Sequence, residues 1–336
     1  MEKEILRQIN KPIFYVTNDV SRAVGLEKIL PDYHIVCLDD HPLVTYLLKE
    51  GVSVFCLERE LGRQNEIARN AGTILSHPLV LSFIKEKSKK ETPNVLFFKP
   101  QKRIEFIAKK FGFNLIGNST DLSRIFEDKI SFLNICLENN LKIVPGEIYN
   151  LNNIKYSDLV KRFGNQTVIQ FGRGWAGNST YFLRSEDELE KIKEENGNIE
   201  IRASRFINGI TVLNNAVIYG ENTFISSPAV QIKAEQILTS TQGGTGGRQW
   251  PAKLNQRQEK EIEAITFEVA KVMKRKGYRG IFGLDFLVEE VSEEVYLSEN
   301  NARITASVPF YTKLELSKGC LPLLGFHLLS FLHNNE

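Results

Sequence analysis

The sequence of 336 residues contains little cysteine, and its four cysteines are scattered along the chain. They form no C-x-x-C pair and no cysteine–histidine spacing suited to zinc. Cys37, Cys56 and Cys136 lie inside apolar segments, which is typical of buried thiols in a reducing compartment. The pattern argues against a zinc-binding module and against a disulfide-bonded secreted protein, so we expect a cytoplasmic protein.

The sequence also lacks an excess of charge of either sign and a long hydrophobic run. Lys and Arg number 43 and Asp and Glu number 41, a net charge of +2, so no overall basic field attracts nucleic acid. The longest apolar stretch, residues 321–332, contains Pro322 and His327, is too short to span a bilayer and predicts a buried helix. Residues 1–10 lack the apolar core of a secretory signal. We therefore expect neither nucleic acid nor a membrane as a partner.

The first third of the chain alternates short apolar runs with amphipathic stretches but has no G-x-G-x-x-G fingerprint. Such runs between helical segments predict a parallel sheet covered on both faces, an open sheet of the Rossmann type. The expected strands are residues 12–17, 33–38, 52–57 and 95–98, with one helical stretch ending at residue 30 and another at 101–111. The turn after the first strand reads Asn18-Asp19-Val20, so we do not expect dinucleotide binding in this domain.

Strands dominate the later part of the chain, so we expect an α/β fold that becomes α+β in the C-terminal half. The expected elements are helices at 128–140, 156–163, 186–195 and 259–276, and strands at 167–171, 180–183, 201–206, 211–218, 283–288 and 295–298. The elements between residues 156 and 195 predict a small α/β lid. We therefore divide the chain into an N-terminal domain, a lid and a C-terminal domain, with boundaries at 1–120, 121–203 and 204–336.

The strongest chemical signal is a predicted hairpin near the C-terminus. Its first strand alternates, so Asp285 shares a face with Ile281 and Leu287. A three-residue loop centred on Ser292 places Asp285 directly across from Glu299. Two carboxylates that face one another on an inward face repel and are poorly solvated. A divalent cation would remove that penalty.

The second strand of the hairpin carries further polar residues. By the same alternation, Glu299, Asn301 and Arg303 share a face with Val295 and Leu297. Carboxylate and amide oxygens are hard ligands that suit Mg²⁺ or Mn²⁺ bridging nucleotide phosphates. Arg303 adds a planar cation for a phosphate or a carboxylate. A solvated hairpin with incidental acids is the alternative.

A glycine-rich loop joins two predicted strands of the lid. Gly172, Gly174 and Gly177 allow backbone N–H groups to wrap phosphate oxygens. Taken alone, the loop is more typical of a plain hairpin connection.

Together these features resemble the ATP-grasp superfamily over most of the chain. The matching order is an N-terminal α/β domain, a lid with a glycine loop, a strand with Asp285 and Phe286, and an E-x-N-x-R run that starts at Glu299. The resemblance implies an ATP-grasp fold that binds ATP together with Mg²⁺ or Mn²⁺, with Asp285, Glu299 and Asn301 as the metal ligands.

The resemblance also implies roles in nucleotide binding. Lys129 follows an aspartate at the start of a helix and resembles the D-K motif of the family, whose lysine contacts nucleotide phosphate. The backbone of Arg205 and Ile207 would hold the adenine edge, with Phe206 beside the ring. Ser204 occupies one position from which family members hold the ribose, and its role here stays open.

One position departs from the family pattern. The strand before the glycine loop usually carries a lysine that reaches the α- and β-phosphates, whereas this sequence has Gln170. Glutamine donates hydrogen bonds but supplies no charge. Arg173 in the loop is a candidate for the missing charge. Weak nucleotide binding or lost catalysis is the alternative.

Residues 242–250 form a glycine-rich segment that resembles the mobile loop closing over the acylphosphate in ATP-grasp ligases. Arg248 is then a candidate for binding the substrate carboxylate, and a flexible solvent loop is the alternative. Residues 304–309 lie where peptide ligases of the family place a substrate-contacting loop, which makes Thr305 and Ser307 further candidates.

The resemblance predicts an ATP-dependent carboxylate–amine ligase that works through an acylphosphate and releases ADP and phosphate. Arg303 and Arg248 are the expected catalytic residues, a small-molecule acid and an amine are the expected substrates, and a homodimer is favoured. The short stretch after the E-x-N-x-R run is more similar to D-alanine–D-alanine ligases than to biotin carboxylases. Other ATP-grasp chemistry, in a purine pathway or through carboxyphosphate, and a non-catalytic ATP-binding protein are the alternatives.

Overall fold

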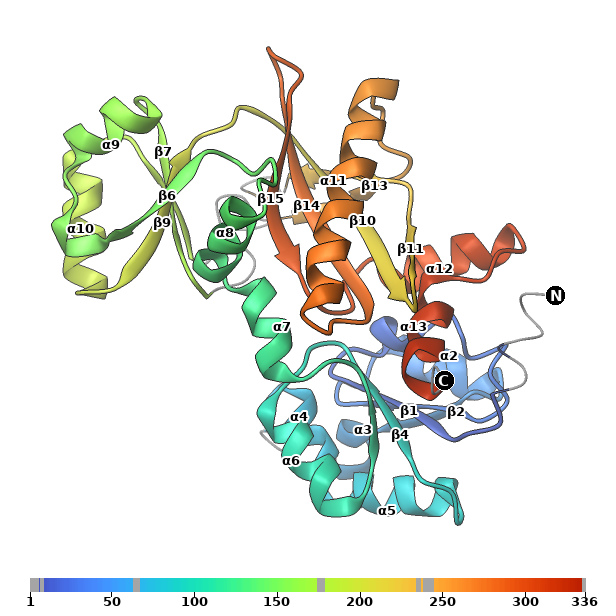
Figure 1. The fold of residues 1–336 in the computed structure, drawn as a ribbon. Helices are drawn as coiled ribbons and strands as arrows, with labels where there is room; N and C mark the ends of the chain where they lie inside the picture. Colours follow the sequence, from blue (N-terminus) through green and yellow to red (C-terminus); the bar gives the residue numbers. More distant parts are fainter. Residues whose placement is uncertain are drawn as a thin grey trace.

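The computed structural model describes residues 6, 9–62, 67–173, 179–233, 237 and 245–333. Three β-sheets build a mixed α/β molecule (Figure 1). The parallel N-terminal sheet lies at the bottom of the view, a small antiparallel sheet at the upper left, and a larger antiparallel sheet above the first and to the right of the second. The expected fold class is confirmed. In the described part of the chain, no helix has the length and apolar character needed to cross a membrane.

The N-terminal sheet is parallel throughout, with the strand order β3-β2-β1-β4-β5. Its strands are β1 Ile13–Thr17, β2 Tyr33–Cys37, β3 Ser53–Cys56, β4 Asn94–Phe97 and β5 Asn114–Ile116. Every residue of β1 and β2 is buried, as expected for a parallel sheet covered on both faces. Four of the five strands are confirmed, whereas β5 is too short to give a periodic signal.

The helical segments of this domain differ in part from the prediction. They are η1 Val20–Ala23, α2 Pro42–Lys49, α3 Leu57–Leu61, α4 Ala71–Leu75, α5 Pro78–Ser88 and α6 Lys102–Phe111. The helix at 101–111 is confirmed as α6. The predicted helical stretch ending at residue 30 is wrong, because only the short turn η1 forms there. Gly25 has a φ of 127°, which no helix tolerates, and a Cβ at this position would lie 2.9 Å from Thr312.

Two helices lead from the N-terminal sheet to the lid: α7 Thr120–Glu127 and α8 Lys129–Glu138. Asp128 begins α8, because its side chain accepts hydrogen bonds from the N–H groups of Ile130 and Ser131 at 3.1 and 3.0 Å. This cap determines where the helix starts, and therefore where the side chain of its first residue lies.

The lid is a four-stranded sheet with the order β6-β9-β7-β8, covered on one face by two helices. Its elements are β6 Gly146–Asn150, η2 Leu151–Asn153, α9 Tyr156–Phe163, β7 Thr167–Phe171, β8 Thr180–Leu183, α10 Glu186–Asn196 and β9 Glu200–Arg205. Ile169, Ile201 and Ala203 pack in the core under α9 and α10. Residues that alternate with them therefore face away from these helices. The predicted lid elements are confirmed.

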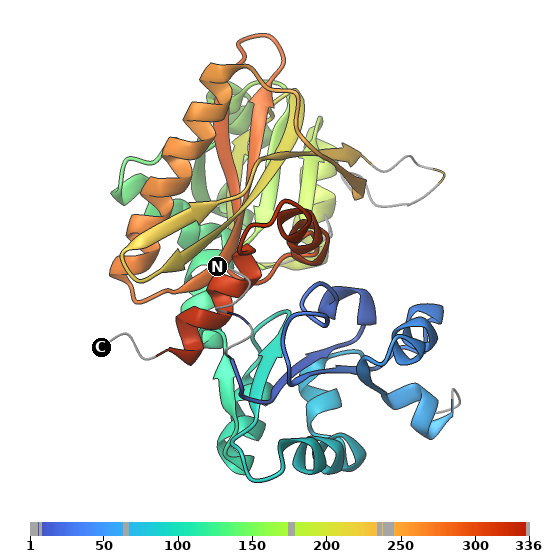
Figure 2. The ribbon, with the colours of Figure 1, turned by 90° about the vertical axis from the view of Figure 1, so that its right-hand side faces the viewer.

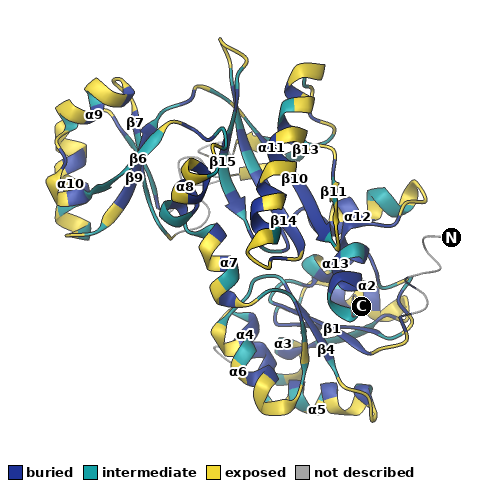
Figure 3. Cartoon of the chain, in the orientation of Figure 1, coloured by how far each residue is buried: buried dark blue, intermediate teal, exposed yellow. Residues whose placement is uncertain are grey.

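The central sheet has the order β13-β12-β10-β14-β15, and β11 pairs with β10. Its strands are β10 Gly209–Tyr219, β11 Asn222–Ile225, β12 Ala229–Lys233, β13 Thr245–Gln249, β14 Gly280–Glu289 and β15 Val295–Asn301. The helix α11 Gln256–Arg275 packs along one face, with its outer side exposed (Figures 2 and 3). The expectation of a loop over residues 242–250 is wrong for Thr245–Gln249, which pair with β12 as a strand.

The helices α12 Val308–Ser317 and α13 Leu323–Leu332 end the fold. The buried helix predicted at 321–332 is confirmed as α13. Leu324 and Leu328 share one core with Ile13 of β1 and Ile281 of β14. One hydrophobic core therefore joins the N-terminal and central sheets. This core packs the two sheets against each other and so positions their edges.

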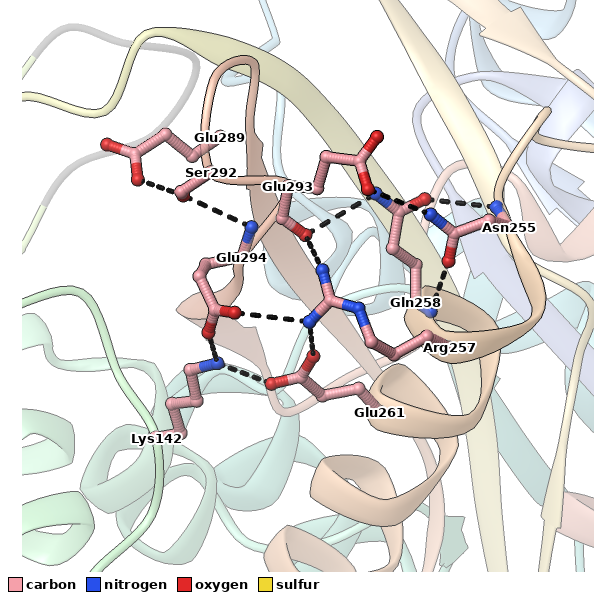
Figure 4. A network of polar contacts seen from close by, with 9 residues as sticks. All are labelled: Lys142, Asn255, Arg257, Gln258, Glu261, Glu289, Ser292, Glu293 and Glu294. Atoms are coloured by element: carbon pink, nitrogen blue, oxygen red, sulfur yellow. Dashed lines mark hydrogen bonds and ion pairs between the residues drawn. The ribbon is translucent and has the colours of Figure 1, made fainter.

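A network of polar contacts holds the turn between β14 and β15 against the start of α11 (Figure 4). Lys142 pairs with both Glu261 and Glu294. Arg257 reaches the Glu294 carboxylate at 3.1 Å and the Glu293 carbonyl at 2.8 Å. Single exposed ion pairs contribute little, whereas linked pairs of this kind restrain a turn. The network therefore supports the register of the hairpin.

The hairpin register confirms that Asp285 lies directly opposite Glu299. The predicted three-residue loop centred on Ser292 is wrong, because Val288 lies opposite Val295 and Phe286 opposite Leu297. A bulge between Phe286 and Asp285 then shifts the pairing and brings Asp285 opposite Glu299. The bulge also changes the alternation of β15. Val295 and Leu297 point into the core beneath α11, whereas Glu299 lines the cleft described below. The prediction that the polar residues of β15 share a face with Val295 and Leu297 is therefore wrong.

His327 joins α13 to the central sheet and gives the fold a pH dependence. Its Nδ1 accepts a hydrogen bond from the Ile281 N–H at 3.0 Å. The ring is buried, and burial lowers its pKa to about 4. The unfolded chain takes up this proton near pH 6.5, so the folded protein loses stability as the pH falls from about 6.5 to 4, by at most ~1.4 kcal/mol per pH unit.

We therefore expect His327→Gln to lose less stability than the unmodified protein between pH 7 and pH 5. Urea unfolding at pH 7, 6 and 5 measures the difference. His333→Gln, which changes an exposed histidine, is the control and should keep the original pH slope. Identical slopes for all three proteins would show that His327 is not the titrating group.

Candidate active site

The three sheets surround a cleft of about 1310 Å³. Its described lining carries far more basic than acidic residues. The basic residues are Arg22, Arg69, Lys99, Lys102, Arg124, Arg173, Arg184, Arg202, Arg205, Lys233, Arg248 and Arg303. The acidic residues are Glu127, Asp128, Asp285 and Glu299. A concave site with this excess of positive charge favours an anionic ligand.

Asp285 and Glu299 form the acidic centre of the cleft. Burial, and next the charge of Glu299, raise the pKa of Asp285 to about 7. The Nζ of Lys129 lies 3.1 Å from Glu299 Oε1, and only 5% of Lys129 is exposed. Lys129 therefore neutralises the carboxylate of Glu299. The repulsion between the two carboxylates shows as the raised pKa of Asp285.

Asn301 and Arg303 continue this centre along β15. The Asn301 Nδ2 donates to Asp285 Oδ1 at 3.4 Å, and its Oδ1 accepts from Arg303 Nη2 at 2.7 Å. The Arg303 Nε lies 3.0 Å from Glu127 Oε1. The predicted metal ligands and the predicted arginine thus lie together, but the amide oxygen of Asn301 is engaged by Arg303.

The donor set fits a divalent cation that takes further ligands from a bound substrate. Among the described residues, no three His, Cys, Asp or Glu side chains group into a metal site of their own. Asp285 and Glu299 provide hard oxygen ligands on facing strands, and a cation between them would relieve their repulsion. The remaining ligands would be water, phosphate oxygens and the amide oxygen of Asn301, which would have to turn from Arg303 to the cation.

Arg248 of β13 reaches the same cleft from the opposite edge of the central sheet. Its Nη1 donates to Ser307 Oγ at 2.7 Å, and the hydroxyls of Ser307 and Thr305 lie 2.9 Å apart. Asn215 donates to Ser307 at 3.1 Å and accepts from Thr305 at 2.6 Å. Three predicted candidates from two segments therefore meet, with Asn215 of β10, in one hydrogen-bonded network that orients the guanidinium group.

On the lid, Gln170 of β7 faces the cleft. Its Nε2 donates to Thr180 Oγ1 at 3.3 Å, and its direct partner across the sheet is Arg202 of β9. Gly172 follows on the same strand end, and its carbonyl accepts a hydrogen bond from the Lys129 N–H at 2.9 Å. This contact fastens the start of α8 to the start of the glycine loop.

The rest of the glycine loop contributes less to the described site. Arg173 lines the cleft but is exposed. Gly174 and Gly177 lie outside the described residues. The predicted phosphate-binding role of the loop therefore stays a prediction.

Arg202 is a residue of the cleft that the sequence analysis missed. Its Nη1 and Nη2 donate to the carbonyls of Ser298 and Val144 at 3.0 and 3.3 Å, and its Nε is buried without a hydrogen-bond partner. Only 1% of the residue is exposed, and burial lowers its pKa to about 10. Its hydrogen bonds go only to carbonyls, and the charge of Glu299 offsets the cost of burial only in part, so this cation also points to an anionic ligand.

The sequence held one signal for Arg202. It stands between Ile201 and Ala203, which pack in the lid core, and so it shares the opposite face with Ser204. An arginine at this alternating position is a charge directed into the fold.

The hinge residues Arg205, Phe206 and Ile207 also line the cleft. The N–H groups of Arg205 and Phe206 are already used, since they donate to the carbonyls of Pro145 and Gln166 at 3.0 and 3.3 Å. Adenine binding by the hinge therefore stays a prediction. The backbone groups left for it are the hinge carbonyls and the N–H of Ile207. Ser204 is buried on the cleft face, and its predicted contact with a ribose is likewise untested.

Comparison with known proteins identifies a matching family. A family model described as an ATP-grasp domain matches residues 126–307, more than half of the chain. A biotin carboxylase from Haemophilus influenzae is 27% identical over 239 residues, which cover 66% of this chain and 50% of the relative. The chain thus spans about half the length of the curated relative that it matches.

Solved structures share the fold at low sequence identity. A biotin carboxylase from Campylobacter jejuni is 15% identical, with a TM-score of 0.70 over 97% of this chain and 72% of its own. D-alanyl-alanine synthetase A from Vibrio cholerae is 13% identical, with a TM-score of 0.63 over 96% of this chain and 99% of its own. An N5-carboxyaminoimidazole synthetase from Staphylococcus aureus complexed with ADP is also 13% identical, with a TM-score of 0.63 over 97% and 78%.

Two charge-removing variants test the acidic centre. Asp285→Asn removes one of two repelling carboxylates, so we expect the free energy of unfolding to rise by about 1 kcal/mol at pH 8 without ligand. Glu299→Gln leaves the buried ammonium group of Lys129 without its acid, so we expect a loss of about 1–3 kcal/mol. Urea unfolding at low ionic strength measures both. Equal destabilisation by the two substitutions would contradict the repulsion between Asp285 and Glu299.

Proposed function

The chain belongs to the ATP-grasp family, and we propose that it is an ADP-forming ligase that joins a carboxylate to an amine. The observation that carries the proposal is the pair of facing carboxylates, Asp285 and Glu299, inside a cleft whose other charged residues are mostly basic. Such a site suits a polyanion that arrives with a divalent cation. ATP with Mg²⁺ or Mn²⁺ is that kind of ligand.

In this proposal Asp285 and Glu299 hold the cation, with Asn301 as a further ligand. Bound Mg²⁺ would neutralise phosphate charge and orient the γ-phosphoryl group. We assign Lys129 to the same γ-phosphoryl group: its buried Nζ pairs with Glu299 at 3.1 Å and would turn from that carboxylate to the phosphate once the cation is bound. The buried Arg202 supplies a second positive charge on the lid face beside Gln170.

The nucleotide would lie between the lid and the central sheet. The phosphates meet Lys129, Arg202 and the backbone around Gly172, and the adenine meets the hinge near Ile207. Ser204 faces the same space and is our candidate for the ribose.

The acid substrate would lie beside the metal-bound phosphate. We assign Arg303 and Arg248 to its carboxylate, since both line the cleft and both lower the pKa of Asp285 through their charge. The carboxylate oxygen bonds to the γ-phosphorus as the bond to ADP breaks. The amine nitrogen then bonds to the acyl carbon, phosphate leaves with the bonding pair, and the amine proton passes to phosphate or water. The protein positions groups and neutralises charge, and no covalent protein nucleophile is needed.

Carboxyphosphate formation from bicarbonate is a second candidate within the family. This candidate is favoured by two similar proteins whose names denote carboxylation, a biotin carboxylase and an N5-carboxyaminoimidazole synthetase. Bicarbonate-dependent ADP release without any amine would distinguish it from amide formation.

The first test of the proposal is magnesium-dependent nucleotide binding. We expect a non-hydrolysable ATP analogue, titrated by calorimetry, to bind at least ~10-fold more tightly with Mg²⁺ than without it. Glu299→Ala should abolish this difference, because it removes a ligand of the cation. Glu290→Ala, which changes an exposed acid of the same hairpin, should leave it intact. Absence of nucleotide binding under both conditions would refute the proposal.

The second test concerns the charge beside Gln170. We expect Arg202→Met to weaken binding of the ATP analogue by ~10–100-fold, the loss of one charge-assisted contact to phosphate. Adding Gln170→Lys should restore most of the affinity, because the two positions are direct neighbours on adjacent strands. Adenosine affinity should change less than ~3-fold in every variant.

The rescue separates a phosphate contact from a structural role. If Arg202 only tied the lid to the carbonyls of Ser298 and Val144, a lysine at position 170 would not replace it. Arg173→Ala is the matched test of the other candidate cation. A loss of affinity in Arg173→Ala alone would assign the missing charge to Arg173 instead.

A further inference from the structure

The carboxyl-terminal edge of the N-terminal sheet opens into the cleft at its topological switch point. The order β3-β2-β1-β4-β5 places β1 between β2 and β4, so the connections leaving β1 and β4 run in opposite directions. In open parallel sheets, ligands bind in the crevice that this divergence leaves. Arg22, in the turn after β1, and Phe98, directly after β4, line the cleft at this point.

Arg22 is oriented there without an acidic partner. Its guanidinium carbon lies 4.1 Å from the centre of the Phe98 ring, and its Nη1 is buried without a hydrogen-bond partner. In the described ranges, no carboxylate forms an ion pair with it. A guanidinium group stacked on a phenyl ring keeps its N–H edge free for a planar anion such as a carboxylate, or for a phosphate.

Two other arginines approach the same region. The guanidinium carbon of Arg303 lies 5.1 Å from the centre of the Phe98 ring. Burial lowers the pKa of Arg248, and the charges of Arg303 and Arg22 lower it further. Glu127 pairs with Arg303 but also with Lys99. The positive charge of this region therefore exceeds what a single carboxylate would neutralise.

The three arginines stand at different places along the cleft. Arg303 binds Asn301, the neighbour of Asp285, and so lies beside the acidic centre. Arg22 stacks on the same Phe98 ring as Arg303, but among the described residues it forms no hydrogen bond or ion pair with Asp285, Glu299 or Asn301. Arg22 therefore lies next to the arginine of the acidic centre without taking part in that centre.

We infer that Arg22 binds a second anionic group of the acid substrate, so that this substrate is a dicarboxylic or a phosphorylated carboxylic acid. This inference rests on the proposed function. The reacting carboxylate takes Arg303 and Arg248, and the second group takes Arg22 at the edge of the N-terminal sheet. Arg22 is thus a specificity residue, and its removal should affect acid binding and leave nucleotide binding unchanged.

The test measures acid binding to the protein loaded with ADP and Mg²⁺. Calorimetric titrations compare succinate and glutarate, 3-phosphoglycerate, and the monocarboxylates acetate and butyrate. We expect at least one dianionic acid to bind ~10-fold or more tightly than the monocarboxylate of similar length. Arg22→Met should abolish that difference and Arg22→Lys should retain part of it. A preference for the dicarboxylates or for 3-phosphoglycerate identifies which second group is recognised.

The catalytic readout uses hydroxylamine, which traps an acylphosphate as a hydroxamate without the natural amine. With the preferred dianionic acid, Arg22→Met should raise KM for the acid by ~10–100-fold and change kcat by less than ~3-fold. KM for ATP should stay unchanged. Arg59→Met is the matched control, because this arginine pairs with Asp40 and does not line the cleft.

The outcomes separate this inference from the proposed function. Equal or tighter binding of monocarboxylates, binding of neither class to the ADP-loaded protein, or an Arg22→Met variant that keeps the dianion preference would each overturn the role of Arg22. In all three cases retained binding of ADP with Mg²⁺ leaves the ligase proposal standing. Loss of ADP binding in the unmodified protein overturns the proposed function itself.

Discussion

The pairing of β14 with β15 is the constraint on which the candidate site depends. It brings Asp285 opposite Glu299, two carboxylates that repel at short range in a poorly solvated place. Lys129, at the start of α8, forms an ion pair with Glu299. The Asp128 cap sets the start of that helix, and thereby the position of Lys129, its first residue. A local capping interaction thus places a residue that contacts Glu299, far away in the sequence. The remaining repulsion is a cost in the free protein that a bound cation would remove.

The rest of the fold arranges positive charge around this centre. The lid sheet contributes Arg202 on the face away from its own core, and β13 contributes Arg248. The N-terminal sheet contributes Arg22 at its switch point, and the core that α13 shares with both sheets keeps this edge next to the centre. Each of these charges is expensive to bury alone. Their convergence is therefore better explained by a polyanionic ligand than by the stability of the protein.

Much of the fold could be predicted because its signals are local. The buried strands of the parallel sheet, the lid elements and α13 follow from apolar runs and alternation within the sequence. The errors arose where geometry overrode periodicity. Gly25 ended an apparent helix through its backbone conformation, and the bulge near Leu297 moved β15 onto the other face. A one-residue bulge leaves no mark in composition or spacing.

The sequence by itself determined the fold class and the hairpin that makes Asp285 and Glu299 neighbours, because both depend on residues close together in the chain. Their direct facing depends on the bulge between Asp285 and Phe286, which only the structure shows. Only the tertiary structure decided which cations surround that pair. Arg202 and Arg248 come from two different sheets, and Arg22 comes from the short helix η1 after β1 of the third sheet. Whether a charged side chain is solvated or buried depends on what packs beside it, and that is decided by contacts between distant segments.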